Sequence, residues 1–173
     1  MPDDDYLAKS PDASRIGKAV EHLVAATCIL ASGAQLNVST SLVDDEGVDL
    51  VFHRRGGSAT LAAQVKSRRT TTTGLERGRF SAQVRHQTFR PRAGLYLLFV
   101  VANAEEATFG PVWLVPSMDF AAKAKEAGRR RHLRFNASPS PNAHDQWRPY
   151  RHERAELPGK ILELLAEAEA VQP

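Results

Sequence analysis

Residues 47–67 read GVDLVFHRRGGSATLAAQVKS, and this stretch decides the fold. Its two halves, residues 48–54 and 59–67, are rich in apolar and β-branched side chains, which favour β-strands. Gly56 and Gly57 between them are typical of a hairpin turn, because such turns need backbone angles that glycine adopts easily. The stretch therefore predicts two antiparallel strands joined at this glycine pair.

The position of the turn determines which side chains share a face of the hairpin. With Gly56 and Gly57 at its centre, Asp49 faces Gln64 across the two strands. Side chains alternate between the two faces of a strand, so one face carries the polar groups and the other belongs against a core. The first face consists of Asp49, Val51, His53, Ala62, Gln64 and Lys66, and the second of Val48, Leu50, Phe52, Leu61, Ala63 and Val65.

The first face brings together a carboxylate, an amide and an amine. Asp49, the amide oxygen of Gln64 and a backbone carbonyl are hard oxygen ligands of the kind that hold Mg²⁺ or Mn²⁺. Lys66 can contact a phosphate or a metal-activated water, and the whole set suits hydrolysis of a phosphodiester. The alternative is a solvated strand face on which Asp49 and Lys66 share no role.

The rest of the chain predicts an α/β domain in which helices flank a central mixed β-sheet. A first helix is expected from its cap Ser14 to Gly33, because apolar side chains recur there at helical spacing. Ser117 is expected to cap a second helix that ends near Gly128. Further strands are expected at residues 35–42, 95–102 and 112–115, a last helix at 158–170, a turn at 44–47, and loops at 70–78 and 136–149.

Two short motifs and the helix before them resemble a known superfamily. GVDL at residues 47–50 is followed by QVKS at residues 64–67, and the preceding helix carries Glu21 in GKAVEHLVA. This ordered set resembles the PD-(D/E)XK nuclease superfamily, also called restriction-endonuclease-like, and is most similar to its Mrr-type branch, in which glutamine replaces the second acid. The resemblance implies a restriction-endonuclease-like fold and a metal-dependent endonuclease that hydrolyses phosphodiester bonds of DNA.

The resemblance also implies a role for each matching residue. Asp49 is implied as the principal ligand of Mg²⁺ or Mn²⁺, with the Gln64 amide oxygen and the Val65 carbonyl as further ligands. Lys66 is implied to orient or activate the attacking water. Glu21 would complete the site from the first helix, directly or through a bound water. Because Gln64 removes one negative charge, either Glu21 compensates or the protein binds nucleic acid without cutting it.

Positive charge is concentrated in the middle of the chain. Residues 54–92 carry ten bases against the single acid Glu76, whereas residues 1–53 carry nine acids and three bases. Of the 23 bases 17 are arginine, whose planar group binds phosphate through paired hydrogen bonds, so the clustering favours a nucleic-acid partner over solvated faces. The expected nucleic-acid-binding residues are Arg68, Arg69, Arg77, Arg79 and Arg85. The side chains of Phe80, Phe89 and Trp147 have polar neighbours in the sequence, so they could be exposed and stack on bases.

The composition is that of one globular domain. With 42% hydrophobic and 25% charged residues, the 173-residue chain can bury a core, which excludes wholesale disorder and a disulfide-stapled miniprotein. Residues 1–13 are expected to form a flexible N-terminus and residues 14–173 a single nuclease-like domain. No uninterrupted apolar run reaches the roughly 18 to 20 residues of a membrane span. The lone Cys28 sits in an apolar run, which is typical of a buried thiol in a reducing compartment. A cytoplasmic protein is therefore expected.

These observations lead to three hypotheses. The first is a DNA endonuclease that acts in restriction, defence or repair. The second is a catalytically inactive protein of the same fold that binds nucleic acid or a protein partner, and the third is an interaction domain whose arginines contact an acidic protein. The lack of a separate recognition domain favours either a homodimer or modest sequence specificity.

Overall fold

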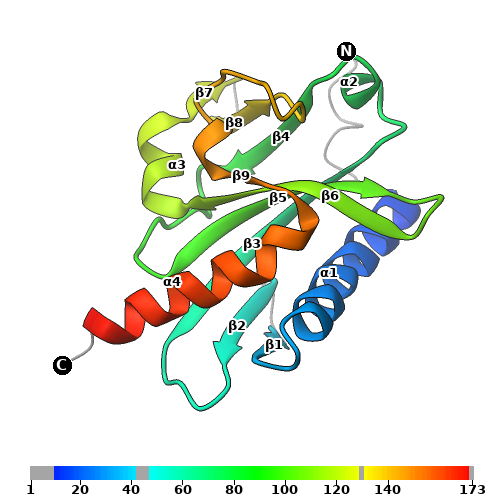
Figure 1. The fold of residues 1–173 in the computed structure, drawn as a ribbon. Coiled ribbons are helices and arrows are strands. Elements are labelled where there is room, and N and C mark those ends of the chain that lie inside the picture. Colours follow the sequence, from blue (N-terminus) through cyan, green and yellow to red (C-terminus); the bar gives the residue numbers. More distant parts are fainter. Residues whose placement is uncertain (1–9, 42–46, 129–130, 172–173) are drawn as a thin grey trace.

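The computed structural model describes residues 10–41, 47–128 and 131–171. Residues 42–46, where most of a turn is expected, lie outside these ranges. The helices are α1 (Pro11–Ala31), α2 (Thr73–Glu76), α3 (Ser117–Lys123) and α4 (Leu157–Val171), with 3-10 turns at Arg148–Tyr150 and Arg154–Glu156. The strands are β1 (Leu36–Thr40), β2 (Leu50–Arg54), β3 (Thr60–Arg69), β4 (Phe80–Arg85), β5 (Leu95–Asn103), β6 (Thr108–Pro116), β7 (Lys125–Ala127), β8 (His132–Ala137) and β9 (Arg151–His152) (Figure 1).

A six-stranded mixed sheet forms the centre of the molecule. Its order is β1-β2-β3-β5-β6-β9, in which β3 and β5 run parallel and the other neighbours run antiparallel. Leu50 lies opposite Ala63, which is the register expected for a turn centred on the glycine pair. The prediction of a central mixed sheet flanked by helices is confirmed.

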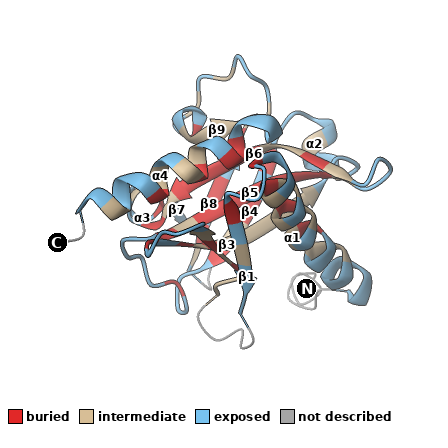
Figure 2. Cartoon of the chain, turned by 60° about the horizontal axis from the view of Figure 1, so that its bottom comes forward, coloured by how far each residue is buried: buried red, intermediate tan, exposed pale blue. Residues whose placement is uncertain are grey.

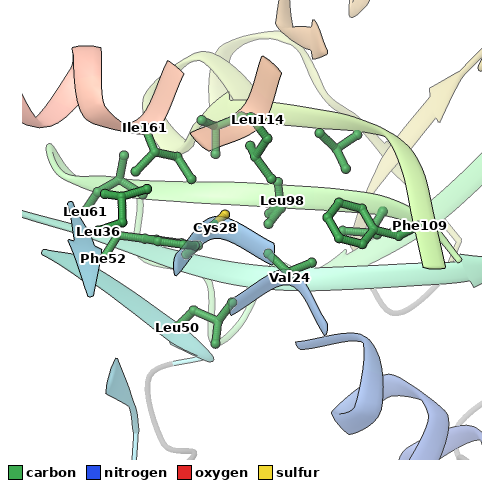
Figure 3. Packing of buried hydrophobic residues seen from close by; sticks show 14 of the residues in the cluster. Val24, Cys28, Leu36, Leu50, Phe52, Leu61, Leu98, Phe109, Leu114 and Ile161 are labelled. Carbon is green, nitrogen blue, oxygen red and sulfur yellow. The ribbon is translucent and has the colours of Figure 1, made fainter. Parts of the chain in front are cut away.

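α1 and α4 lie together over one face of this sheet (Figure 1). α1 presents the buried side chains of Val20, Val24 and Cys28, which follow one another at intervals of about one helical turn. They pack against the apolar side of the hairpin, which includes Leu50 and Phe52 (Figure 3). Figure 2 shows that exposed residues lie on the outer sides of these helices. The helices therefore hold the hairpin through an apolar core.

A second, three-stranded sheet, which the sequence does not predict, covers the opposite face. Its order is β4-β8-β7, with antiparallel pairing throughout. Its inward side chains meet those of β5 and β6 in an aromatic cluster, where the rings of Phe135 and Phe99 stack with centroids 3.7 Å apart. Phe80, Phe89 and Trp147 belong to this cluster and are buried. The expectation that these three side chains are open to stacking on bases is therefore wrong.

The first helix begins earlier than expected. Its cap is Ser10, whose Oγ accepts a hydrogen bond from the backbone N–H of Ala13 at 3.1 Å, and a proline follows the cap. Ser14 therefore lies inside α1 and is not the cap. Residues 11–13 belong to the helix, and the rest of the expected flexible N-terminus, residues 1–9, lies outside the described ranges. Neither α1 nor any other helix of the described residues is long and apolar enough to cross a membrane.

α3 is shorter than expected and has a different start. Ser117 does not cap it, because its hydroxyl donates to the carbonyl of Arg92 at 2.8 Å and accepts from the N–H of Arg92 at 2.9 Å. α3 ends at Lys123 instead of near Gly128. Residues 125–127 leave the helix because they pair with β8 as the edge strand of the second sheet.

Candidate active site

The candidate site lies where β2 and β3 separate. β2 begins at Leu50, and the N–H of Asp49 donates to the carbonyl of Ala63 at 2.9 Å, so the strand pairing stops one pair short of the expected Asp49–Gln64 pair. The next backbone donor of β3 on this side is the N–H of Val65, and it binds a side chain instead of a strand carbonyl. Oδ2 of Asp49 accepts this hydrogen bond at 2.6 Å. The N–H and C=O of a strand residue point to the same side, so the Val65 carbonyl is also directed toward Asp49.

Gly47 makes room for the side chain of Gln64. Its φ of +69° is in the left-handed region, and a Cβ at this position would lie 2.8 Å from Nε2 of Gln64, closer than real Cβ atoms approach. The Gln64 amide therefore lies against the backbone two residues before Asp49. Asp49, Gln64 and Val65 are thus brought together at the end of the hairpin.

Lys66 follows Gln64 on the same face of β3. In the parallel pairing Gln64 lies opposite Leu97 of β5, and Lys66 lies opposite Phe99. Both side chains are half-buried, and Leu97 and Phe99 belong to the aromatic cluster under the second sheet. The amide and the ammonium therefore lie on the side of the main sheet that the second sheet covers.

Glu21 approaches from the other side of the main sheet, which α1 covers. Its side chain is 13% exposed, and its Oε2 lies 2.7 Å from Nζ of Lys18. Val24, one turn further along α1, lies beside Leu50 (Figure 3). Since residues three apart share a helix face, Glu21 and Val24 lie on the same side of α1. In the structure, the Glu21 carboxylate pairs with Lys18 of the same helix.

Among the residues that the structure describes, Asp49 is the acid established at the candidate site. Within the described residues, no group of three or more histidines, cysteines or acids is placed to hold a metal ion. A cation at this place would therefore depend on Asp49, the Gln64 amide and the Val65 carbonyl. All three are hard oxygen donors, which suit Mg²⁺ or Mn²⁺, but they carry a single negative charge.

The expected nucleic-acid-binding arginines follow the site along the chain. Arg68 is half-buried and donates to the carbonyl of Ser67 at 2.9 Å. The other four are exposed, and they lie at the end of β3, on the segment from α2 to β4, and at the end of β4: Arg69, Arg77, Arg79 and Arg85.

Sequence reasoning missed two parts of this region. Gly47 was predicted only as part of a turn. Its contact with Gln64 forms in the folded chain between distant positions of the sequence, so no local pattern indicates it. Lys125 and Arg134 lie beside each other on the second sheet and were not assigned a role. The alternation of polar and apolar side chains in residues 132–137 was the available signal for that strand.

Comparison with known proteins bears on the fold. No protein-family model matches the sequence, and no curated protein matches it. The structure is similar to that of a bacterial homing endonuclease, I-Ssp6803I, with a TM-score of 0.57 over 93% of this chain and 98% of that chain, at 17% sequence identity. The chain shares its fold with a nuclease. At this identity the similarity concerns the fold, and the chemistry has to be argued from the residues.

Proposed function

We propose that the protein is an endonuclease that hydrolyses phosphodiester bonds of DNA with Mg²⁺ or Mn²⁺, as a member of the PD-(D/E)XK superfamily close to its Mrr-type branch. The observation that carries the proposal is the hydrogen bond of 2.6 Å that the Asp49 carboxylate accepts from the N–H of Val65, the residue between Gln64 and Lys66 in the sequence. The site lies in a chain whose fold is similar, over 93% of its length, to that of a homing endonuclease.

The residues fit a divalent cation in a specific way. The absence of a Cβ at Gly47 leaves the space that the Gln64 amide occupies, so an oxygen donor can stand beside Asp49. Asp49, Gln64 and the Val65 carbonyl would hold the ion. When bound, the ion supplies a water of lowered pKa and positive charge next to the phosphoryl oxygens.

The chain's own groups orient the site and contact the phosphate. The Val65 N–H fixes the direction of the Asp49 carboxylate. Lys66 places an ammonium group on the same strand face as Gln64, where it holds a phosphate oxygen or orients the attacking water. Arg69, at the end of the same strand, is exposed and continues the positive charge beyond the site.

Substitution of Asp49 tests the proposal. Asp49→Asn keeps an oxygen that can accept the Val65 hydrogen bond but removes the negative charge that a cation needs. We expect cleavage of plasmid and linear DNA in Mg²⁺ or Mn²⁺ to fall by at least about 100-fold, as measured by gel electrophoresis. Lys66→Met should also lose activity, because it keeps the apolar stem and removes the ammonium group.

Asp12→Asn is the matched control, because Asp12 lies on α1 with 88% of its side chain exposed. It should cleave as fast as the wild type. If the wild type does not cleave, or if Asp49→Asn cleaves as well as Asp12→Asn, the protein is not a nuclease that uses this site.

A second candidate is a protein of the same fold that binds nucleic acid without cutting it. Gln64 favours it, because the described residues include no cluster of three acids and the site carries little negative charge. Salt-dependent DNA binding by a wild type that never cleaves would select this candidate.

The proposal includes the setting of the protein. We propose that the single nuclease-like domain expected over residues 14–173 also includes the first residues of α1, from Pro11, and that it works in the cytoplasm in restriction, defence or repair. We also propose that it acts as a homodimer, because cutting both strands of a duplex is simplest with two sites.

A further inference from the structure

The second sheet turns one face toward the core and one face outward. Phe80, Ala82 and Val84 of β4 and Leu133 and Phe135 of β8 point into the aromatic cluster. The alternate residues form what we call the outer face, and most of them are exposed. The outer face consists of Ser81, Gln83 and Arg85 of β4, Lys125 of β7, and His132, Arg134 and Asn136 of β8.

The outer face carries positive charge without acids of its own. Arg134 lies between Gln83 of β4 and Lys125 of β7, and Arg85 lies one pair along, opposite His132. In the described part of the chain, none of Arg85, Lys125 and Arg134 has an acidic partner in an ion pair. Three cations on neighbouring strands repel one another, so a polyanion is the ligand that they complement.

The nearest acid of the sheet is already engaged. Glu126 of β7 lies 3.2 Å from Nη2 of Arg131 and 3.6 Å from Nε2 of His86. The hydrogen bond from Arg131 holds the pKa of the Glu126 carboxyl below its ordinary value, so this acid stays ionised and paired with these groups. Glu126 also pairs in register with Leu133, whose side chain points to the other face. With Arg131 already beside it, Glu126 balances at most part of the charge of the three cations on the outer face.

The chemistry of the face favours a duplex over a single strand. Proteins that bind single strands on a sheet present aromatic side chains on which bases stack. Here the aromatic residues of β4 and β8, Phe80 and Phe135, point into the core and are fully buried. The outward residues are arginine, lysine, glutamine, asparagine and serine, which contact phosphates and the edges of paired bases. A shallow hollow of about 350 Å³ beside Lys125 and Arg134 is also lined by Gln146 and by the carboxylate-bearing Glu126.

We propose that duplex DNA docks on the outer face of the second sheet, with Arg85, Lys125 and Arg134 on its phosphates and Gln83 and Asn136 toward its bases. The choice of DNA as the polyanion rests on the proposed function. The second sheet covers the side of the main sheet on which Gln64 and Lys66 lie, so its outer face is separated from these two residues by the second sheet and the aromatic cluster. A duplex on the outer face would therefore reach the candidate site by extending past the edge of the second sheet.

The salt dependence of binding tests the proposal. We would measure the fluorescence anisotropy of a labelled duplex of about 30 base pairs in EDTA, where a metal-dependent enzyme does not cut, over a series of salt concentrations. The full-length variant Arg85→Gln/Arg134→Gln should lower the slope of log affinity against log salt by about 2, because each phosphate contact contributes about 0.9. The wild type should bind the duplex more tightly than a single strand of the same sequence.

The matched control removes the same charge elsewhere. Arg15→Gln/Arg55→Gln changes two exposed arginines, one on α1 and one in the turn between β2 and β3, and should keep the wild-type slope. Thermal unfolding of both double variants checks that they fold. The proposal is overturned if the two double variants have the same slope, if the wild type binds single strands as tightly as the duplex, or if it binds no duplex at low salt.

Failure of this proposal and failure of the nuclease proposal give different results. A wild type that cuts DNA while the outer-face variant binds normally refutes the docking face alone. A wild type that binds through the outer face and never cuts refutes the nuclease and leaves the docking face intact.

Discussion

Gln64 is the residue on which the chemistry of the candidate site depends most. It stands beside Val65, whose N–H holds the Asp49 carboxylate, and its amide fills the space that Gly47 leaves. An amide donates its oxygen to a cation more weakly than a carboxylate does, because it carries no charge. A cation held by Asp49 and Gln64 would therefore meet one negative charge from this pair of side chains.

Gln64→Glu should strengthen binding of the cation. The substitution keeps the length of the side chain and adds one negative charge beside Asp49, so we expect Mn²⁺ to bind about tenfold more tightly, as measured by isothermal titration calorimetry. Gln35→Glu, at an exposed position before β1, is the control and should leave the affinity unchanged. Equal Mn²⁺ affinities of Gln64→Glu and the wild type would show that Gln64 does not face the cation.

The residues of the hairpin were predictable because their signals are local. Alternation and the glycine pair set the register, and Leu50 lies opposite Ala63 as expected. The hydrogen bond that the Val65 N–H donates to the Asp49 carboxylate could not be predicted. It forms only because the pairing of β2 with β3 stops one residue pair earlier than expected. Whether Glu21, Gln64 and Lys66 share a role with Asp49 stays a prediction.

At the scale of elements, the second sheet shows where local signals fail. β7 is three residues long and follows α3, and lysine, glutamate and alanine are residues that favour helices. They form a strand only because β8 offers a partner, so tertiary pairing overrides local propensity. β4 and β8 alternate regularly, but no strand was predicted at residues 80–85 or 132–137, and the second layer was missed.

The aromatic cluster that joins the two sheets should be sensitive to truncation of Phe135. This ring stacks on Phe99 at 3.7 Å and contacts Phe80, Trp113 and Trp147 at centroid distances of 4.9 to 5.8 Å. Phe135→Ala should lower the free energy of unfolding by about 3 to 5 kcal/mol, measured by urea denaturation, because it opens a cavity in a packed core.

Phe135→Leu serves as the comparison, because it fills more of the space and should lose clearly less stability. A loss below about 1 kcal/mol for Phe135→Ala would show that the second sheet is not held by this cluster.

At the scale of the whole molecule, charge is divided between the two sides. The helix-covered side carries Glu163, Glu167 and Glu169 on α4 against Lys160, whereas the outer face of the second sheet is cationic. The net charge of +3 conceals this division. A polyanion is therefore attracted most strongly to the outer face.

Global stability should fall in alkaline solution because of Cys28. Burial raises the pKa of its thiol from 9.0 to about 12. Above about pH 9 the unfolded chain loses this proton while the folded chain keeps it, so the free energy of unfolding decreases by up to about 1.4 kcal/mol per pH unit until about pH 12.

Urea denaturation of the wild type and Cys28→Ala at several pH values checks this expectation. The stability of the wild type should fall more steeply than that of the variant over this range, since all other groups titrate in both proteins. Parallel pH curves for the two proteins would contradict the buried, protonated thiol.

The aromatic cluster has a consequence for how a duplex would be handled. The cluster packs the second sheet against β5, the parallel neighbour of β3, so the outer face and the Asp49 site are connected through one packed core. On the proposed function and docking face, the protein would set the distance from the contacted bases to the cut. The DNA has to supply any bending, and flexible pyrimidine–purine steps between the two places should be cut faster than stiff adenine tracts.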